Sequence, residues 1–204
     1  MKPELILIGG GGHCKSCIDV IERENKYRIA GIVDTHEKKK QHVLGYEIIA
    51  SDDELAELSK QYSNFLITLG QIKNPSKRIA LFRQLAKESV CFPIVVSPHA
   101  YISLHAQIGE GTVVMHGAVV NAGAVIGKNC IINTSAVVEH DAVIGDHCHI
   151  STSCVVNGGA KIGNCSFIGS NAVIREYIEI GENSVIGAGL RIMRPLPPDS
   201  FEKV

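Results

Sequence analysis

The feature that most constrains the fold is a six-residue repeat in the second half of the chain. From Ile102 to Ile192, every sixth residue is isoleucine or valine, and the register never slips. Four residues after most of these positions stands a small residue, such as Ala106, Ala118 or Cys130. A β-sandwich would show a period of two residues and irregular turn spacing, so the pattern argues against that fold.

This repeat predicts a triangular β-helix. Each hexapeptide would form one short strand and one corner, with the β-branched residue inside and the small residue leaving room for the turn. Three hexapeptides would close a coil of 18 residues, and stacked coils would pair as parallel strands about 4.8 Å apart. We expect five full coils over residues 102–191, within a β-helical domain at 98–194 followed by a C-terminal tail at 195–204.

The first hundred residues show a different pattern, in which short apolar runs alternate with helical segments. We expect strands over residues 5–8, 27–33, 64–69 and 91–96, and helices over 15–24, 51–60 and 75–88. Ser51 and Glu54 have the spacing of a capping box at the start of the second helix. The alternation predicts an α/β domain over residues 1–97, with a small parallel sheet and helices on its faces.

Composition and charge narrow the possible partners. A net charge of −1 provides no general attraction for nucleic acid or an anionic membrane, and 5% aromatic residues provide few surfaces for base stacking. The N-terminus does not resemble a signal peptide, and no apolar run approaches the ~18 residues of a membrane helix. The seven scattered cysteines argue against a disulfide framework. We expect a cytoplasmic protein with no nucleic-acid or membrane partner.

One candidate site lies at the carboxyl ends of the predicted parallel strands, where ligands bind in open sheets. Four glycines at residues 9–12 end the first strand and precede a helix, so their amides and the helix dipole favour a phosphate. Asp34 ends the second strand, where a carboxylate can accept a hydrogen bond from a ribose or sugar hydroxyl. Gly70 ends the third strand, and His13 follows the glycines. A plain strand–helix turn is the alternative.

The residues after the glycines argue against two other enzyme classes. Read from Gly9, Cys14 stands where the dinucleotide fingerprint has its third glycine, which disfavours a dehydrogenase. Cys14 and Cys17 also form a C-x-x-C motif at a helix start, but without the surrounding thioredoxin pattern. We therefore expect Cys17 to pack as a small apolar residue of the helix.

A second candidate site lies within the repeat. His140 falls at a corner of its coil and should point outward, and Asp141 beside it could fix its tautomer. The residues one coil before and one coil after it are Ala122 and Gly158, whose small size would leave a recess beside the histidine. A histidine with these neighbours can act as a general base. A plain surface histidine is the alternative.

Nine histidines also raise the possibility of a zinc site. Some β-helix enzymes, such as the γ-type carbonic anhydrases, bind zinc through three histidines gathered from neighbouring protomers. Their spacing, one histidine followed at a distance by two more that are five apart, is not reproduced by His116, His140, His147 and His149. We expect no metal, and a zinc hydratase is a less favoured alternative.

Several of these motifs together resemble the PglD/NeuD family of bacterial sugar O- and N-acetyltransferases, which are left-handed β-helix acyltransferases. The motifs are the hexapeptide array, the glycines followed by His13, Asp34, the junction at residues 97–100, and the segment from Asn133 to His149. The resemblance covers nearly the whole chain. It implies a Rossmann-like N-terminal domain that binds a nucleotide-linked amino sugar. It also implies a homotrimer that holds acetyl-CoA between adjacent left-handed parallel β-helices.

The same resemblance implies roles for individual residues. His140 would be the general base that removes a proton from the sugar amine, and Asp141, where many relatives have glutamate, would orient it. The remaining predicted positions are Asn133, His149 and Gly158 for acetyl-CoA, and Gly12, His13, Asp34 and Gly70 for the sugar nucleotide.

The reaction implied by the resemblance is N-acetylation of a UDP-linked 4-amino-4,6-dideoxy sugar by acetyl-CoA, through direct transfer in a ternary complex. Such a reaction would serve bacterial surface glycans or nonulosonic acids. An O-acetyltransferase acting on sialic acid or another sugar is the alternative within the family. A non-catalytic trimeric binding module is the alternative outside it.

Overall fold

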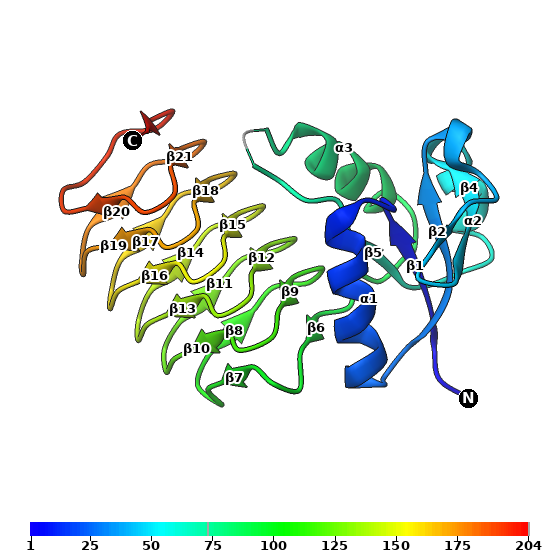
Figure 1. Ribbon diagram of the computed structural model, residues 1–204, viewed down its shortest axis with the longest axis horizontal. Helices are drawn as coiled ribbons and strands as arrows, with labels where there is room; N and C mark the ends of the chain where they lie inside the picture. The colour runs from blue at the N-terminus through cyan, green and yellow to red at the C-terminus, as the bar shows by residue number, and fades with distance from the viewer. Residues whose placement is uncertain (73, 204) are drawn as a thin grey trace.

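The structure, a computed structural model, describes residues 1–72 and 74–203 (Figure 1). An α/β part lies at the N-terminal end, and a stack of short strands extends away from it to the C-terminus. Within the described residues, none of the helices combines the length and the apolar character needed to cross a membrane.

The N-terminal part is built on a five-stranded sheet in the order β3-β4-β2-β1-β5. Its parallel strands are β1 (Glu4–Ile8), β2 (Arg28–Asp34), β4 (Tyr46–Ser51) and β5 (Phe65–Ile67), and β3 (His42–Val43) pairs antiparallel with β4. The helices are α1 (Gly12–Glu24), α2 (Leu55–Leu58) and α3 (Ser76–Leu85), with 3-10 turns η1 (His36–Lys38) and η2 (Asp52–Glu54). The predicted Rossmann-like sheet is confirmed.

The first strand shows why its residues are apolar at every position. Alternate side chains of a strand point to opposite faces of the sheet. Leu5 and Leu7 pack with residues of α1, whereas Ile6 and Ile8 pack with residues of α2 and α3. Because helices cover both faces, both sets of side chains are buried, as is usual for a parallel sheet.

The prediction missed the hairpin of β3 and β4. We predicted no strand over residues 42–51, yet β4 pairs with β2 along its length. The turn between β3 and β4 is formed by Leu44 and Gly45, with φ of 47° and 88°. Two positive φ angles are the signature of a type I′ hairpin turn, which asparagine or glycine usually begins. Leucine at the first turn position concealed the signal.

The predicted fourth strand at residues 91–96 was also wrong. Only β6 (Val95–Val96) is a strand there, and it pairs with β9 (Val113–Val114) of the β-helix. Cys91 makes an isolated bridge to Asn64 at the edge of the N-terminal sheet. Pro93 separates the two, because proline has no N–H to donate to a strand ladder and interrupts the run.

The second half of the chain forms a left-handed β-helix with three faces. The first face contains β7 (Tyr101–Ile102), β10 (Val119–Val120), β13 (Val137–Val138), β16 (Val155–Val156), β19 (Val173–Ile174) and β22 (Arg191–Ile192). The second contains β8 (Gln107–Ile108), β11 (Val125–Ile126), β14 (Val143–Ile144), β17 (Lys161–Ile162) and β20 (Glu179–Ile180). The third contains β6, β9, β12 (Ile131–Ile132), β15 (His149–Ile150), β18 (Phe167–Ile168), β21 (Val185–Ile186) and β23 (Phe201–Glu202).

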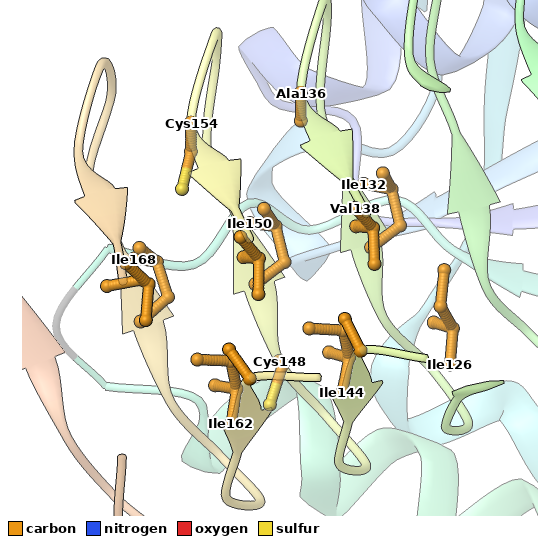
Figure 2. Packing of buried hydrophobic residues seen from close by; sticks show 14 of the residues in the cluster. Ile126, Ile132, Ala136, Val138, Ile144, Cys148, Ile150, Cys154, Ile162 and Ile168 are labelled. Carbon is orange, nitrogen blue, oxygen red and sulfur yellow. The ribbon is translucent and has the colours of Figure 1, made fainter. Parts of the chain in front are cut away.

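The predicted stacking of residues 18 apart is confirmed. Ile126, Ile144 and Ile162 follow one another in the register of the second face, and their side chains form a column in the core (Figure 2). The small residues expected at the corners, such as Ala136 and Cys154, are fully buried. The β-branched side chains therefore fill the prism while the small ones allow the chain to turn.

The third face of the prism carries the N-terminal part. Val113 and Met115 belong to the same buried cluster as helix α1. Beside them, Nε2 of His116 lies 2.7 Å from Oδ2 of Asp19, and Nδ1 of His116 lies 2.6 Å from Oγ of Ser97. This chain of hydrogen bonds links α1 to the β-helix, so the two parts share an interface of apolar and polar contacts.

Candidate active site

The glycine loop lies at the carboxyl end of β1, where the chain turns into α1. Gly9 has φ 102°, which only glycine adopts readily. Gly11 caps α1 without a side-chain hydrogen bond, and the first turn of the helix has no acidic residue. A Cβ added at Gly11 or Gly12 would meet nothing within 4 Å. The N-terminus of this 13-residue helix is therefore accessible, and its N–H groups and dipole favour an anion.

Asp34 is engaged by its own chain. Its Oδ2 accepts hydrogen bonds from the Gly10 N–H at 2.8 Å and from Lys38 Nζ at 3.0 Å, and its Oδ1 accepts from the Thr35 N–H at 2.7 Å. Burial raises the pKa of Asp34, but these hydrogen bonds together outweigh burial, and the net pKa is lowered. The carboxylate orders the glycine loop from the end of β2.

The residues predicted at the mouth of the sheet meet two residues of the β-helix at its third face. The ring centroids of His13 and His149 are 6.4 Å apart, and a Cβ on Gly70 would lie 3.5 Å from the Cβ of His13. Nδ1 of His149 donates to the Gln71 carbonyl at 2.5 Å, and the amide of Asn133 donates to Nε2 of His149 at 3.0 Å. This pairing assigns the Nδ1–H tautomer to His149. We call these five residues the domain-junction cluster.

Both histidines of the cluster, His13 and His149, are neutral at neutral pH. Burial, reinforced by Arg78 and His149, lowers the pKa of His13 to about 3. Burial also lowers the pKa of His149 to about 4, against the opposing hydrogen bond to the Gln71 carbonyl. The cluster thus contains two neutral imidazoles beside the buried guanidinium of Arg78.

His140, Asp141 and Gly158 meet at the corner between the first and second faces. Nδ1 of His140 lies 2.9 Å from Oδ2 of Asp141, and both side chains are more than half exposed. The ring leans over the next coil, because a Cβ on Gly158 would lie 2.6 Å from Nε2 of His140. With Nδ1–H donating to the carboxylate, Nε2 carries the lone pair, and the ring fills the space that a Cβ on Gly158 would take. The arrangement can accept a proton there.

The structure divides the predicted site residues into two groups. The corner between the first and second faces of a triangular prism lies opposite the third face. His140 therefore lies on the far side of its own β-helix from the domain-junction cluster, which includes His149. The sequence prediction placed these histidines in one site, and a single chain does not bring them together.

Two residues in or beside the domain-junction cluster, Gln71 and Arg78, were not predicted as site residues. Gln71 is buried, and neither of its side-chain polar atoms has a hydrogen-bond partner among residues 1–72 and 74–203. Arg78 is also buried, and its guanidinium donates to the carbonyls of Ile67, Leu69 and Asn129. A signal for Arg78 existed in the sequence, because it precedes Leu81, Phe82 and Leu85 at the spacing of one apolar helix face.

Two observations bear on the alternative chemistries. The predicted packing of Cys17 in the helix is confirmed, since both cysteines of the C-x-x-C are fully buried and burial raises the pKa of Cys14 to about 11. In the described part of the chain, no group of three or more histidine, cysteine, aspartate or glutamate side chains is placed to hold a metal ion.

Comparison with known proteins matches both halves of the chain. Residues 4–85 match the PglD N-terminal domain, and residues 105–140, 123–158 and 159–194 match the six-repeat bacterial transferase hexapeptide. None of the curated proteins matches the chain.

Three solved structures are similar over nearly the whole length. The acetyltransferase domain of PglB from Neisseria gonorrhoeae FA1090, in complex with acetyl coenzyme A, is 30% identical with a TM-score of 0.89, and the match covers 98% of this chain and 96% of that one. PerB from Caulobacter crescentus, in complex with CoA and GDP-perosamine, is 31% identical with a TM-score of 0.90, covering 97% and 92%. WeeI from Acinetobacter baumannii AYE shares the fold, with 17% identity, a TM-score of 0.61 and coverage of 98% and 96%.

The identity and the coverage extend across both the N-terminal sheet and the β-helix. The chain therefore belongs to the PglD/NeuD family of hexapeptide-repeat sugar acetyltransferases.

Proposed function

We propose that the protein transfers the acetyl group of acetyl-CoA to the amine of a nucleotide-linked 4-amino-4,6-dideoxy sugar, with His140 as the general base. The observation that carries the proposal is the corner geometry, in which Asp141 holds Nδ1 and the His140 ring lies against Gly158 with Nε2 as the proton acceptor. The family and the acetyl coenzyme A complex of the Neisseria relative support the acyl donor.

The reaction proceeds by direct attack in this proposal. The sugar amine nitrogen bonds to the thioester carbonyl carbon while Nε2 of His140 takes a proton from the nitrogen. The tetrahedral intermediate then collapses, the C–S bond breaks, and the proton on His140 passes to the leaving thiolate. Asp141 stabilises the imidazolium that forms between these steps. The Gly158 N–H has no acceptor among residues 1–72 and 74–203 and is available to the developing oxyanion.

The sugar nucleotide binds, in this proposal, at the N-terminal part. Its diphosphate lies at the start of α1, where Gly12 leaves the helix N-terminus open. Its sugar extends toward His13 and Gly70, and on to the rest of the domain-junction cluster, where His149 and Asn133 lie. Asp34 supports this site by ordering the glycine loop, and its free lone pairs remain available to a hydroxyl.

A second copy of the chain completes the site. His140 lies opposite the domain-junction cluster of its own chain. In this proposal a partner therefore supplies either His140 or the cluster to each site. The corner of His140 is flanked by outward valines of the first and second faces, which form an apolar surface suited to another β-helix. They are Val119, Val137, Val155 and Val173 on the first face, and Val125 and Val143 on the second. A homotrimer, with acetyl-CoA between adjacent β-helices, satisfies this arrangement.

Complementation between subunits tests the shared site. Mixed trimers of His140→Ala and His13→Ala chains should regain activity that neither variant has alone. Some interfaces then combine an intact His140 from one chain with an intact domain-junction cluster from the other. Mixtures of two different substitutions at His140 serve as the matched control and should stay inactive. Failure of the first mixture to recover activity, with subunit exchange shown by mass spectrometry, would contradict the shared site.

Thiol release from acetyl-CoA tests the reaction itself. The acceptors are UDP-, GDP- and dTDP-linked amino sugars together with sialic acid. We propose UDP as the nucleotide, and GDP-perosamine, bound by the Caulobacter relative, is the first competing acceptor to measure. The expected result is rapid release with one nucleotide amino sugar, reduced about 10²-fold or more in His140→Ala. Release with sialic acid alone would favour O-acetylation, and no release with any acceptor would contradict acetyl transfer.

A further inference from the structure

Tyr177 occupies a backbone conformation that a bulky residue rarely adopts. Its φ is 57°, in the left-handed region, where a side chain approaches the backbone closely. The β-helix places most of its corners in this conformation and usually fills them with glycine, asparagine, aspartate or serine, as at Gly159, Asn171 and Asp141. Tyrosine at such a corner is strained, and strain of this kind tends to persist where function requires it.

The packing of its own chain does not explain Tyr177. The side chain is 75% exposed, and its hydroxyl has no hydrogen-bond partner in the described part of the chain. His147, the other ring at a left-handed corner, differs because it bonds to Asn129 and packs edge-on against Phe82 at 5.5 Å. The ring of Tyr177 is therefore held at the surface with its area available to another molecule.

Tyr177 lies two coils beyond the candidate base, at the same corner. The Gly159 N–H donates to the His140 carbonyl at 2.9 Å, and the Tyr177 N–H donates to the Gly158 carbonyl at 3.0 Å, so the three coils are in register. A Cβ on Gly158 would overlap the His140 ring, and a Cβ on Gly159 would overlap the Tyr177 ring. The two rings thus lean toward each other over a pair of adjacent glycines.

The direction of this corner indicates which substrate Tyr177 meets. The N-terminal part lies at one end of the β-helix, and β19, which precedes Tyr177, is farther from it than β13, which precedes His140 (Figure 1). Continuing the same way, the corner reaches Arg194, which lies 3.8 Å from Glu202, and Arg175, which lies 3.4 Å from Glu176, stands just before Tyr177. An acyl donor that carries phosphates at one end and a thioester at the other would extend from these cations to His140.

We propose that Tyr177 is a positioning residue whose ring packs against the thioester end of acetyl-CoA and holds it over Gly158 and Gly159, beside His140. The proposal rests on the proposed acetyl transfer. The ring face supplies apolar contact, and the hydroxyl is not required. The left-handed strain is retained because asparagine or glycine, which would relieve it, has no ring to offer.

The test compares Tyr177→Asn with Tyr177→Phe and with Cys165→Asn. Cys165, with φ 63°, occupies an equivalent corner between the second and third faces and serves as the matched control for relieved strain. Tyr177→Asn should raise the KM for acetyl-CoA about tenfold or more through lost apolar contact. The same change should raise the apparent Tm by about 2–4 °C at fixed protein concentration through relieved strain. Tyr177→Phe should keep KM within about threefold, and Cys165→Asn should leave KM unchanged.

Calorimetric titration with CoA separates this proposal from the acetyl-transfer proposal. CoA binding should weaken in Tyr177→Asn by the same factor as KM while the trimer stays intact in sedimentation. If the wild type transfers no acetyl group yet binds CoA, acetyl transfer fails while the titration still tests Tyr177. The Tyr177 proposal is overturned by unchanged KM and CoA affinity in Tyr177→Asn. It is also overturned by a loss in Tyr177→Phe equal to that in Tyr177→Asn, or by dissociation of the trimer, which would make Tyr177 an interface residue.

Discussion

Gly158→Ala tests whether the catalytic role of this corner depends on the position of the His140 ring. The new methyl carbon would lie 2.6 Å from Nε2 and 2.7 Å from Cε1 of His140, inside the closest approach that real contacts allow. The backbone of Gly158 does not have a positive φ, so alanine itself is tolerated there. The ring is the flexible partner because its side chain is 56% exposed. The substitution should therefore displace the ring and leave the coil intact.

The expected sizes of the two effects differ. The unfolding free energy should change by no more than about 1 kcal/mol, because the ring can move into solvent and alanine restricts the unfolded chain. A displacement of about 1 Å at a reacting group reduces the rate by roughly 10²-fold, so kcat/KM should fall by that factor, or about 2.7 kcal/mol of transition-state stabilisation.

A double-mutant cycle then isolates the mechanism. Urea unfolding and thiol release are measured for Gly158→Ala, His140→Ala and the double variant. If the methyl group acts only through His140, it should cause no further loss in the His140→Ala background. Gly187→Ala is the control for an added methyl group elsewhere in the β-helix, where the nearest atom, the Glu202 carbonyl oxygen, would lie at 3.2 Å. Additive losses in the cycle, or full activity of Gly158→Ala, would refute the reasoning.

Three further predictions concern stability and reactivity. Arg78→Met should lower the unfolding free energy by about 3 kcal/mol or more in urea, because buried carbonyls lose a charged donor, whereas Arg83→Met on the exposed side of α3 should change it little. The lowered pKa values of His13 and His149 mean that the unfolded chain binds more protons below pH ~6.5. Urea unfolding should therefore show stability falling toward pH ~4 by up to ~1.4 kcal/mol per pH unit for each ring, with a shallower slope in His13→Gln. Iodoacetamide should alkylate exposed Cys91 first, and mass spectrometry should find the two C-x-x-C thiols unmodified until urea unfolds the protein; early modification of those thiols would contradict their burial.

The β-helix was predictable because its information is local and repeated. Each hexapeptide specifies one inward aliphatic residue and one small corner residue, and the same instruction recurs from Ile102 to Ile192. No long-range pairing has to be guessed, since the neighbour of each strand is always 18 residues away. The outward direction of His140 and its position over the small Gly158 followed from the same register.

The N-terminal part was predicted less completely, because its pairing is not local. β6 follows the sheet in sequence but joins the β-helix, and Pro93 was the one local sign of that change. Arg78 is buried only because α3 packs where Asn129 of the β-helix presents its carbonyl, 51 residues later. Neither partner can be identified from the residues around it.

The sequence by itself determined the architecture, the family resemblance and the pairing of His140 with Asp141, because these depend on neighbours at fixed spacing. Only the tertiary structure decided that His140 and His149 lie on opposite sides of one prism and that Asp34 is held by its own loop. It also decided that Tyr177 leans over Gly159 toward the base. These relations depend on which face of a coil another segment covers, and that is set by packing between distant parts of the chain.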